Sequence, residues 1–403
     1  MTDPVLSICV PTRNRAPYLR YLLDRLAGDM AGFPFPWEVF VSDNASTDET
    51  PSVIDAAAER LPLRWSRRSD AATVHENYHA AICAARGRYA VYLADDDFLF
   101  PDALAAAVQQ LEDRPEAVGL YAPWTLYDLV RDRPVDQFYR QPDDVVIARG
   151  DYSALAEHVV GHRVFSEISI VRADVFRRAD PVSLDHAFWA FVFPCEFLGY
   201  GDLIYAATPF YGSVTEHVVG GERAQNGFEE ARTAWDKYRG GLEVLVGLAQ
   251  AHGRMANPVA VRVGMERMLI DRMAVALRLR VSQGGDPIES YTLGARLRGA
   301  GALDKLTLPF ESLRIAAAIH YAARLLPDRL GARRVLLLGD CPEETLATFR
   351  MGASVTVAAA ADAAAIDADD VVILLGSEDA PPPEVASAAL AALPEGDLLR
   401  KFP

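Results

Sequence analysis

The stretch Tyr89–Leu104, YAVYLADDDFLFPDAL, decides the fold of this chain. A short apolar run ends in three consecutive aspartates, Asp95 to Asp97, and Pro101 then opens an alanine-rich helix. Adjacent carboxylates repel one another and resist burial, so a fold that places three of them at the end of a strand usually holds a cation there. An acidic turn in which Asp97 or Asp102 only caps the helix is an equally good interpretation of the triplet alone.

Two stretches nearer the N-terminus repeat the arrangement of an apolar strand followed by polar residues. VLSICV (residues 5–10) runs into Pro11-Thr12-Arg13-Asn14, and WEVFVS (37–42) runs into Asp43-Asn44. Helical patterns separate the strands, which is typical of a mostly parallel sheet covered by helices. In such sheets ligands bind beyond the carboxyl ends of the strands. We therefore expect the three polar clusters to meet in one crevice, and this convergence favours a functional site over a simple acidic turn.

Composition and charge exclude several classes of protein. The chain has 403 residues, enough for at least two domains, and its formal net charge of -16 argues against nucleic acid as a partner bound through a basic surface. The four cysteines are far apart and lack CxxC pairing, which disfavours a zinc site or a disulfide framework. The loops GxGxxG and GxxxxGK[ST] are missing after the first strand, which disfavours a nicotinamide-dependent dehydrogenase and a P-loop NTPase.

The expected location is the cytoplasm, with peripheral contact at the inner face of the membrane as a further possibility. The N-terminal residues lack the basic leader and apolar core of a signal peptide, and no window approaches the roughly 20 apolar residues of a membrane span. Arginines between Arg262 and Arg280 border an apolar helix face, a pattern that fits contact with anionic lipid. A helix packed on the catalytic domain or on another subunit predicts the same pattern.

The predicted fold class is α/β in three parts. Residues 1–225 form a Rossmann-like domain with a mostly parallel sheet, residues 226–330 a helical region, and residues 331–403 a small C-terminal α/β module. That module restarts strand-helix alternation at RVLLLG (334–339) but lacks the glycines that close approach to a dinucleotide requires. We expect it to be structural or to form a surface for a partner, including a second copy of the chain.

The motifs together resemble family 2 glycosyltransferases of the GT-A fold. VPTRNR (10–15), SDNASTDET (42–50) and GRYAVYLADDDFLFPDAL (87–104) follow the order of that family's VPxYNR-like start, DDxSxDxT loop and DxD motif. In detail the chain looks closest to the abequosyltransferase-like branch, because SDNAS replaces DDGS and ADDD replaces DADD. The phrase ENYHAAICAARGRY, which contains Asn77, also resembles that branch.

The resemblance implies roles for the residues at matching positions. Its nucleotide-sugar pocket maps onto Pro11, Thr12, Arg13, Asp43, Asn77, Asp95 and Asp96. Mg²⁺ or Mn²⁺ would bind Asp96 and Asp97, because Ala94 stands where the family usually has its leading aspartate. His217 resembles the late histidine that some GT-A enzymes offer to the metal or the diphosphate.

The family's general base, which an inverting transfer needs, is harder to place. In the family it precedes a strand that GDLIYAATP (201–209) resembles, but the usual Glu-Asp pair is missing from the preceding segment. The candidates are Asp185, His186 and Glu196. Asp185 is favoured because it begins an apolar segment where a cleft rim is expected, although a helix cap is its alternative role. His186 also fits a packed side chain, and Glu196 lies deeper in the apolar run.

The predicted function is therefore a metal-dependent, inverting glycosyltransferase of surface polysaccharide or glycoconjugate synthesis. It would move a hexosyl or deoxyhexosyl group from a UDP-, GDP-, dTDP- or CDP-linked donor to a glycan, lipid-linked or protein acceptor. A divalent ion would stabilise the charge that builds on the departing nucleoside diphosphate. Two alternatives stay open: a nucleotidyltransferase, whose Gly-rich basic loop is missing here, and a non-catalytic sugar-nucleotide-binding assembly protein that lost the base.

Overall fold

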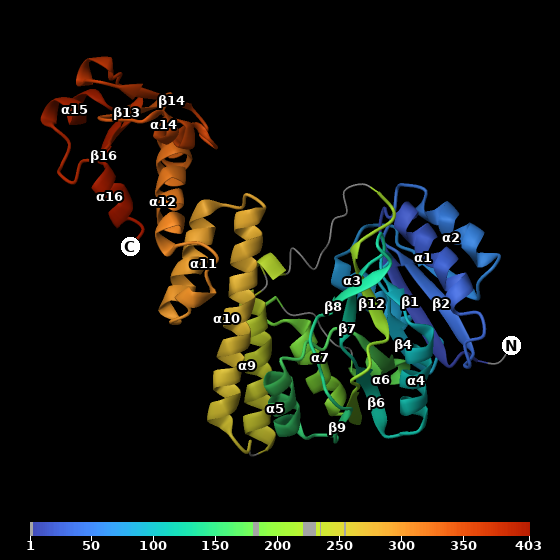
Figure 1. The fold of residues 1–403 in the computed structure, drawn as a ribbon. Helices are drawn as coiled ribbons and strands as arrows, with labels where there is room; N and C mark the ends of the chain where they lie inside the picture. Colours follow the sequence, from blue (N-terminus) through green and yellow to red (C-terminus); the bar gives the residue numbers. More distant parts are fainter. Residues whose placement is uncertain (1–2, 180–184, 221–230, 234, 254) are drawn as a thin grey trace. The chain divides into compact units, whose positions relative to one another are not determined.

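The structure is a computed structural model that describes residues 3–179, 185–220, 231–233, 235–253 and 255–403 (Figure 1). The chain divides into two compact units. The first combines Met1–Gln225 with Asp236–Met268, and the second combines Asn226–Trp235 with Leu269–Pro403. The predicted domain boundaries after residues 225 and 330 stay predictions, and the first residues of the predicted helical region, 226–230, lie outside the described residues.

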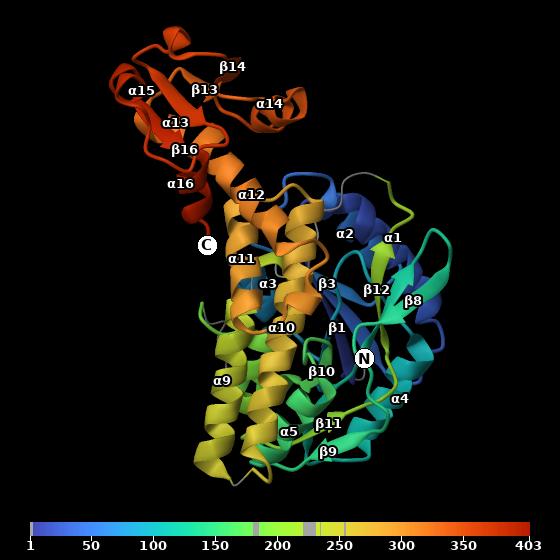
Figure 2. The same cartoon turned by 60° about the vertical axis from the view of Figure 1, so that its left-hand side comes forward.

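An eight-stranded mixed sheet forms the centre of the first unit, in the order β3-β2-β1-β4-β10-β6-β11-β9 (Figures 1 and 2). Its strands are β1 (Leu6–Thr12), β2 (Trp37–Asp43), β3 (Leu63–Arg67), β4 (Tyr89–Tyr92), β6 (Ala117–Tyr121), β9 (Val145–Ile147), β10 (Ser169–Arg172) and β11 (Asp202–Tyr205). Strands β3, β2, β1 and β4 are parallel, whereas β10 is antiparallel to both β4 and β6. The predicted α/β class with a mostly parallel sheet is confirmed.

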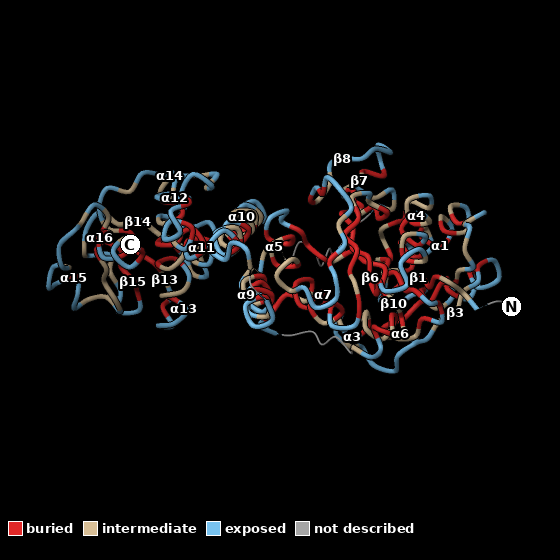
Figure 3. The backbone as a smooth tube through the Cα atoms, turned by 90° about the horizontal axis from the view of Figure 1, so that it is seen from below, coloured by how far each residue is buried: buried red, intermediate tan, exposed pale blue. Residues whose placement is uncertain are grey.

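Helices bury both faces of this sheet, which explains why its central strands are apolar throughout instead of alternating. Figure 3 shows β1, β6 and β10 as buried segments. The helices of the first unit are α1 (Ala16–Asp29), α2 (Thr50–Ala58), α3 (Val74–Cys83), α4 (Pro101–Glu112), α5 (Tyr152–His162), α6 (Ala173–Ala179), α7 (Trp189–Leu198), α9 (Trp235–His252) and the first part of α10 (Pro258–Ser282). A proline stands in the first turn of α1, α2 and α4, where the missing N–H costs no helical hydrogen bond.

Gly87 lets β4 lie directly beside β1. A Cβ at this position would come within 2.7 Å of the Ser7 backbone nitrogen and 2.8 Å of the Leu6 carbonyl carbon. The Gly87 N–H instead donates a 2.8 Å hydrogen bond to Ser7 Oγ. The glycine therefore fixes the start of the strand that leads into the aspartate triplet.

A second sheet of four strands crosses the carboxyl end of the first. Its order is β5-β12-β7-β8, with bounds β5 (Phe98–Leu99), β7 (Trp124–Asp128), β8 (Arg133–Gln137) and β12 (Tyr211–Glu216). Strand β5 begins directly after Asp97 and pairs with β12 through Leu99 and Tyr211. The aspartate triplet therefore lies where one sheet ends and the other begins.

The second unit joins helices to a small parallel sheet of order β14-β13-β15-β16. Its strands are β13 (Arg334–Leu338), β14 (Thr356–Ala360), β15 (Asp370–Leu374) and β16 (Ala391–Pro394), and its helices include the second part of α10, α11 (Pro287–Gly299), α12 (Phe310–His320), α13 (Leu326–Leu330), α14 (Glu343–Arg350), α15 (Pro383–Ala388) and α16 (Glu395–Arg400). One apolar core, which includes Leu297, Ala317, Val335 and Val371, connects these helices to the sheet.

No helix in the described parts of the chain combines the length and the hydropathy of a membrane span.

Candidate functional site

The polar clusters that follow β1, β2 and β4 interlock at the carboxyl edge of the sheet. Thr12 and Asp43 are register partners at the ends of β1 and β2. Thr12 Oγ1 donates a 2.6 Å hydrogen bond to Asp95 Oδ2 in the segment that follows β4. The Asn14 N–H donates to Ser46 Oγ at 2.8 Å, and the Thr47 N–H donates to Asn14 Oδ1 at 2.7 Å. The three polar clusters expected to converge are thus joined by direct contacts between their loops.

Two residues of these loops adopt backbone angles that are rare outside glycine. Asn14 has a φ of 52° and Ala45 a φ of 56°, both in the left-handed region. Such conformations cost free energy and persist where the surrounding contacts fix them, which is common at functional sites. Here the hydrogen bonds between the two loops hold both residues in place.

Asp95 is buried and both of its oxygens carry protein contacts. Oδ2 accepts the Thr12 hydrogen bond, and Oδ1 lies 3.2 Å from Arg15 Nε. Burial raises the pKa of Asp95 from 3.8 to about 6; the Arg15 charge opposes this shift and the neighbouring Asp96 charge adds to it. The same guanidinium also forms an ion pair with Asp96 Oδ2. Arg15 therefore bridges two of the three aspartates.

Asp97 ties the two sheets together. Its Oδ2 accepts a 2.8 Å hydrogen bond from the Tyr211 hydroxyl, and its Oδ1 accepts a 2.7 Å hydrogen bond from the Val214 N–H. The Tyr211 hydroxyl oxygen in turn accepts a 3.1 Å hydrogen bond from the Ala94 N–H. Strand β12 is thereby attached to the end of β4, and Asp97 has a structural role in addition to the predicted metal contact.

The two carboxylate oxygens of Asp43 have different surroundings. The residue is fully buried; Oδ1 accepts a 3.0 Å hydrogen bond from the Ser46 N–H. Its Oδ2 receives no hydrogen bond from the described residues and lies 3.4 Å from Arg67 Nε. A buried carboxylate oxygen without a hydrogen-bond donor is costly. An N–H or O–H group of a bound molecule would complete it.

The remaining predicted pocket residues have different surroundings. Asn77 is buried and forms two hydrogen bonds with Ser42. Its Oδ1 accepts one from the Ser42 hydroxyl at 2.8 Å, and its Nδ2 donates the other to the Ser42 carbonyl at 3.0 Å. It therefore holds the end of β2 just before Asp43, and its contact with a base stays a prediction. Pro11 is half-buried in β1, and Arg13 is exposed directly after that strand.

His217 directly follows β12 and packs against α1. Its ring meets Tyr18 and Tyr21 of α1 edge to face, at centroid distances of 5.0 and 4.9 Å. The Val219 N–H donates a 2.9 Å hydrogen bond to His217 Nδ1. The Arg15 guanidinium also lies over the Tyr18 ring, at 4.7 Å. Tyr18 thus contacts both the predicted late histidine and the arginine that binds the aspartates.

The three candidate bases do not form one group. Asp185 and His186 are exposed in the turn before α7, whereas Glu196 is half-buried in the last turn of that helix. The Phe188 N–H donates a 2.7 Å hydrogen bond to the Lys237 carbonyl, and a Cβ at Gly240 would collide with the His186 carbonyl. Helix α9 therefore fixes the position of the turn.

Among the described residues, no group of three or more His, Cys, Asp or Glu side chains is arranged to hold a metal ion. A metal at Asp96 and Asp97 would need ligands from a bound molecule, as the phosphate oxygens of a donor would provide.

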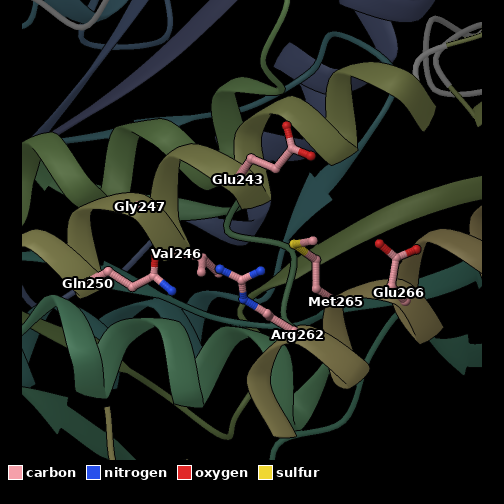
Figure 4. Close-up of a pocket in the computed structure, with 7 residues that line it drawn as sticks. All are labelled: Glu243, Val246, Gly247, Gln250, Arg262, Met265 and Glu266. Atoms are coloured by element: carbon pink, nitrogen blue, oxygen red, sulfur yellow. The ribbon is translucent and has the colours of Figure 1, made fainter. Parts of the chain in front are cut away.

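A cavity of about 240 Å³ lies elsewhere in the first unit, between α9 and the start of α10 (Figure 4). The Arg262 side chain extends from α10 toward α9, where Glu243 and Gln250 also line the cavity. None of its lining residues belongs to the strand-end crevice.

The sequence reasoning missed two residues of this site, Arg15 and Tyr211. Arg15 belongs to the VPTRNR motif and could have been found there, since an arginine three residues after a strand end can reach the polar cluster at that end. Tyr211 offered no such signal, because its contact with Asp97 depends on the second sheet.

The burial of Asp95 predicts a pH dependence of stability. A carboxyl whose pKa is raised in the folded state binds its proton more tightly there, so the stability it contributes is present below about pH 4 and is lost as the pH rises to about 6. Relative to Asp95→Asn, the wild-type chain should lose roughly 1–3 kcal/mol across this window. Urea unfolding in EDTA at several pH values would measure the difference. A difference that stays constant or grows with pH would contradict the assignment.

Part of the chain is similar in sequence to known proteins. Abequosyltransferase RfbV of Salmonella typhimurium is 31% identical over 142 residues, which are 35% of this chain and 42% of that protein. An uncharacterized protein of Mycobacterium tuberculosis is 35% identical over 121 residues, 29% of this chain and 34% of that protein. The chain thus spans less than half the length of these curated relatives. A crystal structure of S. aureus TarS 1-349 in complex with UDP-GlcNAc aligns with 74% of this chain and 88% of its own, at 16% identity and a TM-score of 0.43.

The N-terminal part of the chain also matches a family profile. The matched family is described as glycosyl transferase family 2, and the match extends over residues 7–162. This range contains the ends of β1, β2 and β4 with the aspartate triplet between the two sheets. Residues 7–162 of this chain therefore belong to glycosyl transferase family 2.

Proposed function

We propose that the chain is a metal-dependent, inverting glycosyltransferase that transfers a sugar from a nucleotide-sugar donor to a glycan, lipid-linked or protein acceptor. One observation carries the proposal: within a family 2 domain, the loops after β1, β2 and β4 meet in a crevice that contains Asp43 and the aspartate triplet. A cytoplasmic location and peripheral contact with a membrane are part of this proposal.

The chemistry of the crevice suits the two ends of a sugar nucleotide. At one end, the buried Asp43 Oδ2 needs a hydrogen-bond donor, which an N–H of a base or a hydroxyl of a ribose can supply. At the other end, Arg15 and the carboxylates form a charged cluster beside Thr12. The donor would thus extend from Asp43 to Asp96, with Pro11 and Arg13 beside it.

The residues present fit a divalent metal. Asp96 and Asp97 supply the hard oxygen ligands that Mg²⁺ and Mn²⁺ prefer. When bound, the ion would stabilise the negative charge of the departing diphosphate as a Lewis acid. Asp97 is held rigidly by Tyr211 and Val214, and His217 lies close to the cluster as a further candidate ligand.

Asp185 remains our favoured general base. An inverting transfer requires a group on the opposite side of the sugar from the leaving diphosphate, within reach of the acceptor hydroxyl. The turn that carries Asp185 and His186 is exposed, so an acceptor has access to both side chains. Because α9 fixes this turn through Lys237 and Gly240, the carboxylate would be positioned before the acceptor arrives.

A donor screen tests the proposal. Binding and turnover should be measured with UDP-, GDP-, dTDP- and CDP-sugars, each in Mn²⁺ and in EDTA. We expect one nucleotide class to bind and its turnover to require the metal, because the leaving diphosphate needs charge stabilisation. Asp96→Asn should lower metal-dependent turnover by about 100-fold or more, whereas Asp102→Asn, an exposed aspartate of α4, should behave as wild type. Absence of metal-dependent binding with all donors would refute the proposal.

The placement of the base makes a separate prediction. Asp185→Asn should lower transfer to the acceptor by about 100-fold or more at unchanged donor affinity, because only deprotonation of the acceptor is lost. His186→Ala and Glu196→Gln should have smaller effects. The readout is product formation compared with donor affinity from calorimetry. If none of the three changes lowers transfer, the base lies elsewhere in the chain.

A further inference from the structure

Arg15 occupies the centre of the charged cluster. Its backbone N–H donates to Thr50 Oγ1 at 3.3 Å directly before α1, which fixes the base of the side chain. Its Nε lies 3.2 Å from Asp95 Oδ1, a second guanidinium nitrogen contacts Asp96 Oδ2, and the group lies over the Tyr18 ring. The Arg15 side chain is 20% exposed.

The two aspartates that Arg15 contacts are not equivalent. Asp95 is buried, and each of its two carboxylate oxygens accepts a hydrogen bond from the protein, one from Thr12 and one from Arg15. Asp96 contacts the same guanidinium, and its side chain is 12% exposed. A divalent ion at Asp96 and the guanidinium would therefore share one carboxylate, and two cations this close repel each other.

We propose that Arg15 is a resident cation of the donor site, meaning a positive charge of the protein itself that stays in the site with and without a donor. This inference rests on the proposed function. Before a donor binds, its charge neutralises Asp95 and Asp96 and weakens the binding of a metal on its own. When a donor enters with its metal, the guanidinium contacts the diphosphate while Asp95 keeps it in place. The planar N–H fork of arginine suits this task, because it matches the oxygens of a phosphate in a bidentate manner.

This role differs from that of a purely structural ion pair in a measurable way. If Arg15 only held the loop in shape, its removal would disturb the site and weaken the binding of every ligand. If it is a resident cation, its removal leaves a more negative cluster. The affinity for a cation then rises while the affinity for an anion falls, and damage to the fold does not produce opposite changes.

The experiment uses the full chain as wild type, Arg15→Gln, Arg15→Lys and the control Arg20→Gln. Arg20 lies in α1, which begins directly after Arg15, and its side chain is 56% exposed in an ion pair with Glu49. Calorimetry would measure the affinity for MnCl₂ alone, and in EDTA the affinity for UDP, GDP, dTDP and CDP. We expect Arg15→Gln to bind Mn²⁺ about tenfold more tightly and the selected nucleoside diphosphate about tenfold more weakly. Arg15→Lys should lie between it and wild type, and Arg20→Gln should match wild type.

The outcomes separate this inference from the proposal on which it rests. If Arg15→Gln weakens or leaves unchanged the binding of both ligands while the wild type binds a nucleoside diphosphate, the inference is overturned and the proposed function stands. If the wild type binds none of the four diphosphates, with or without Mn²⁺, both are overturned.

Discussion

The repulsion among three adjacent carboxylates is the constraint on which the rest of this structure depends. The chain meets it by giving each aspartate different surroundings. Asp95 is buried between Thr12 and Arg15, and Asp97 accepts hydrogen bonds from Tyr211 and Val214. Asp96 lies between them and shares the Arg15 cation. The stabilising partners come from β1, from Arg15 directly before α1, and from β12, so segments of both sheets contribute to the surroundings of the triplet.

This arrangement couples the fold to the site. Gly87 brings β4 against β1, and the register of β1 with β2 sets Thr12 beside Asp43. The strained loop residues Asn14 and Ala45 are held by hydrogen bonds between the same loops. The contacts that build the edge of the sheet therefore also hold the carboxylates in position. Under the proposed function, charge that is fixed in this way would stabilise the departing diphosphate.

The sequence predicted most where local pattern and tertiary structure agree. The apolar runs at residues 5–10 and 37–42 became β1 and β2 because both faces of these strands are buried, and the polar residues after them meet as expected. The position of β10 between β4 and β6 could not be predicted from the sequence. The antiparallel insertion of this strand depends on contacts between residues that are distant in sequence. The hydrogen bonds between Asn77 and Ser42 show a supporting position that a motif alone does not reveal, and the contact of Asn77 with a base stays a prediction.

The most direct test of the account is a crystal structure of the chain with a nucleoside diphosphate and Mn²⁺, with anomalous diffraction to locate the metal. The account predicts a manganese peak at Asp96, bridged to the phosphates, with the base or ribose donating a hydrogen bond to Asp43 Oδ2. A nucleotide bound outside the ends of β1, β2 and β4, or a manganese peak away from Asp96 and Asp97, would contradict it.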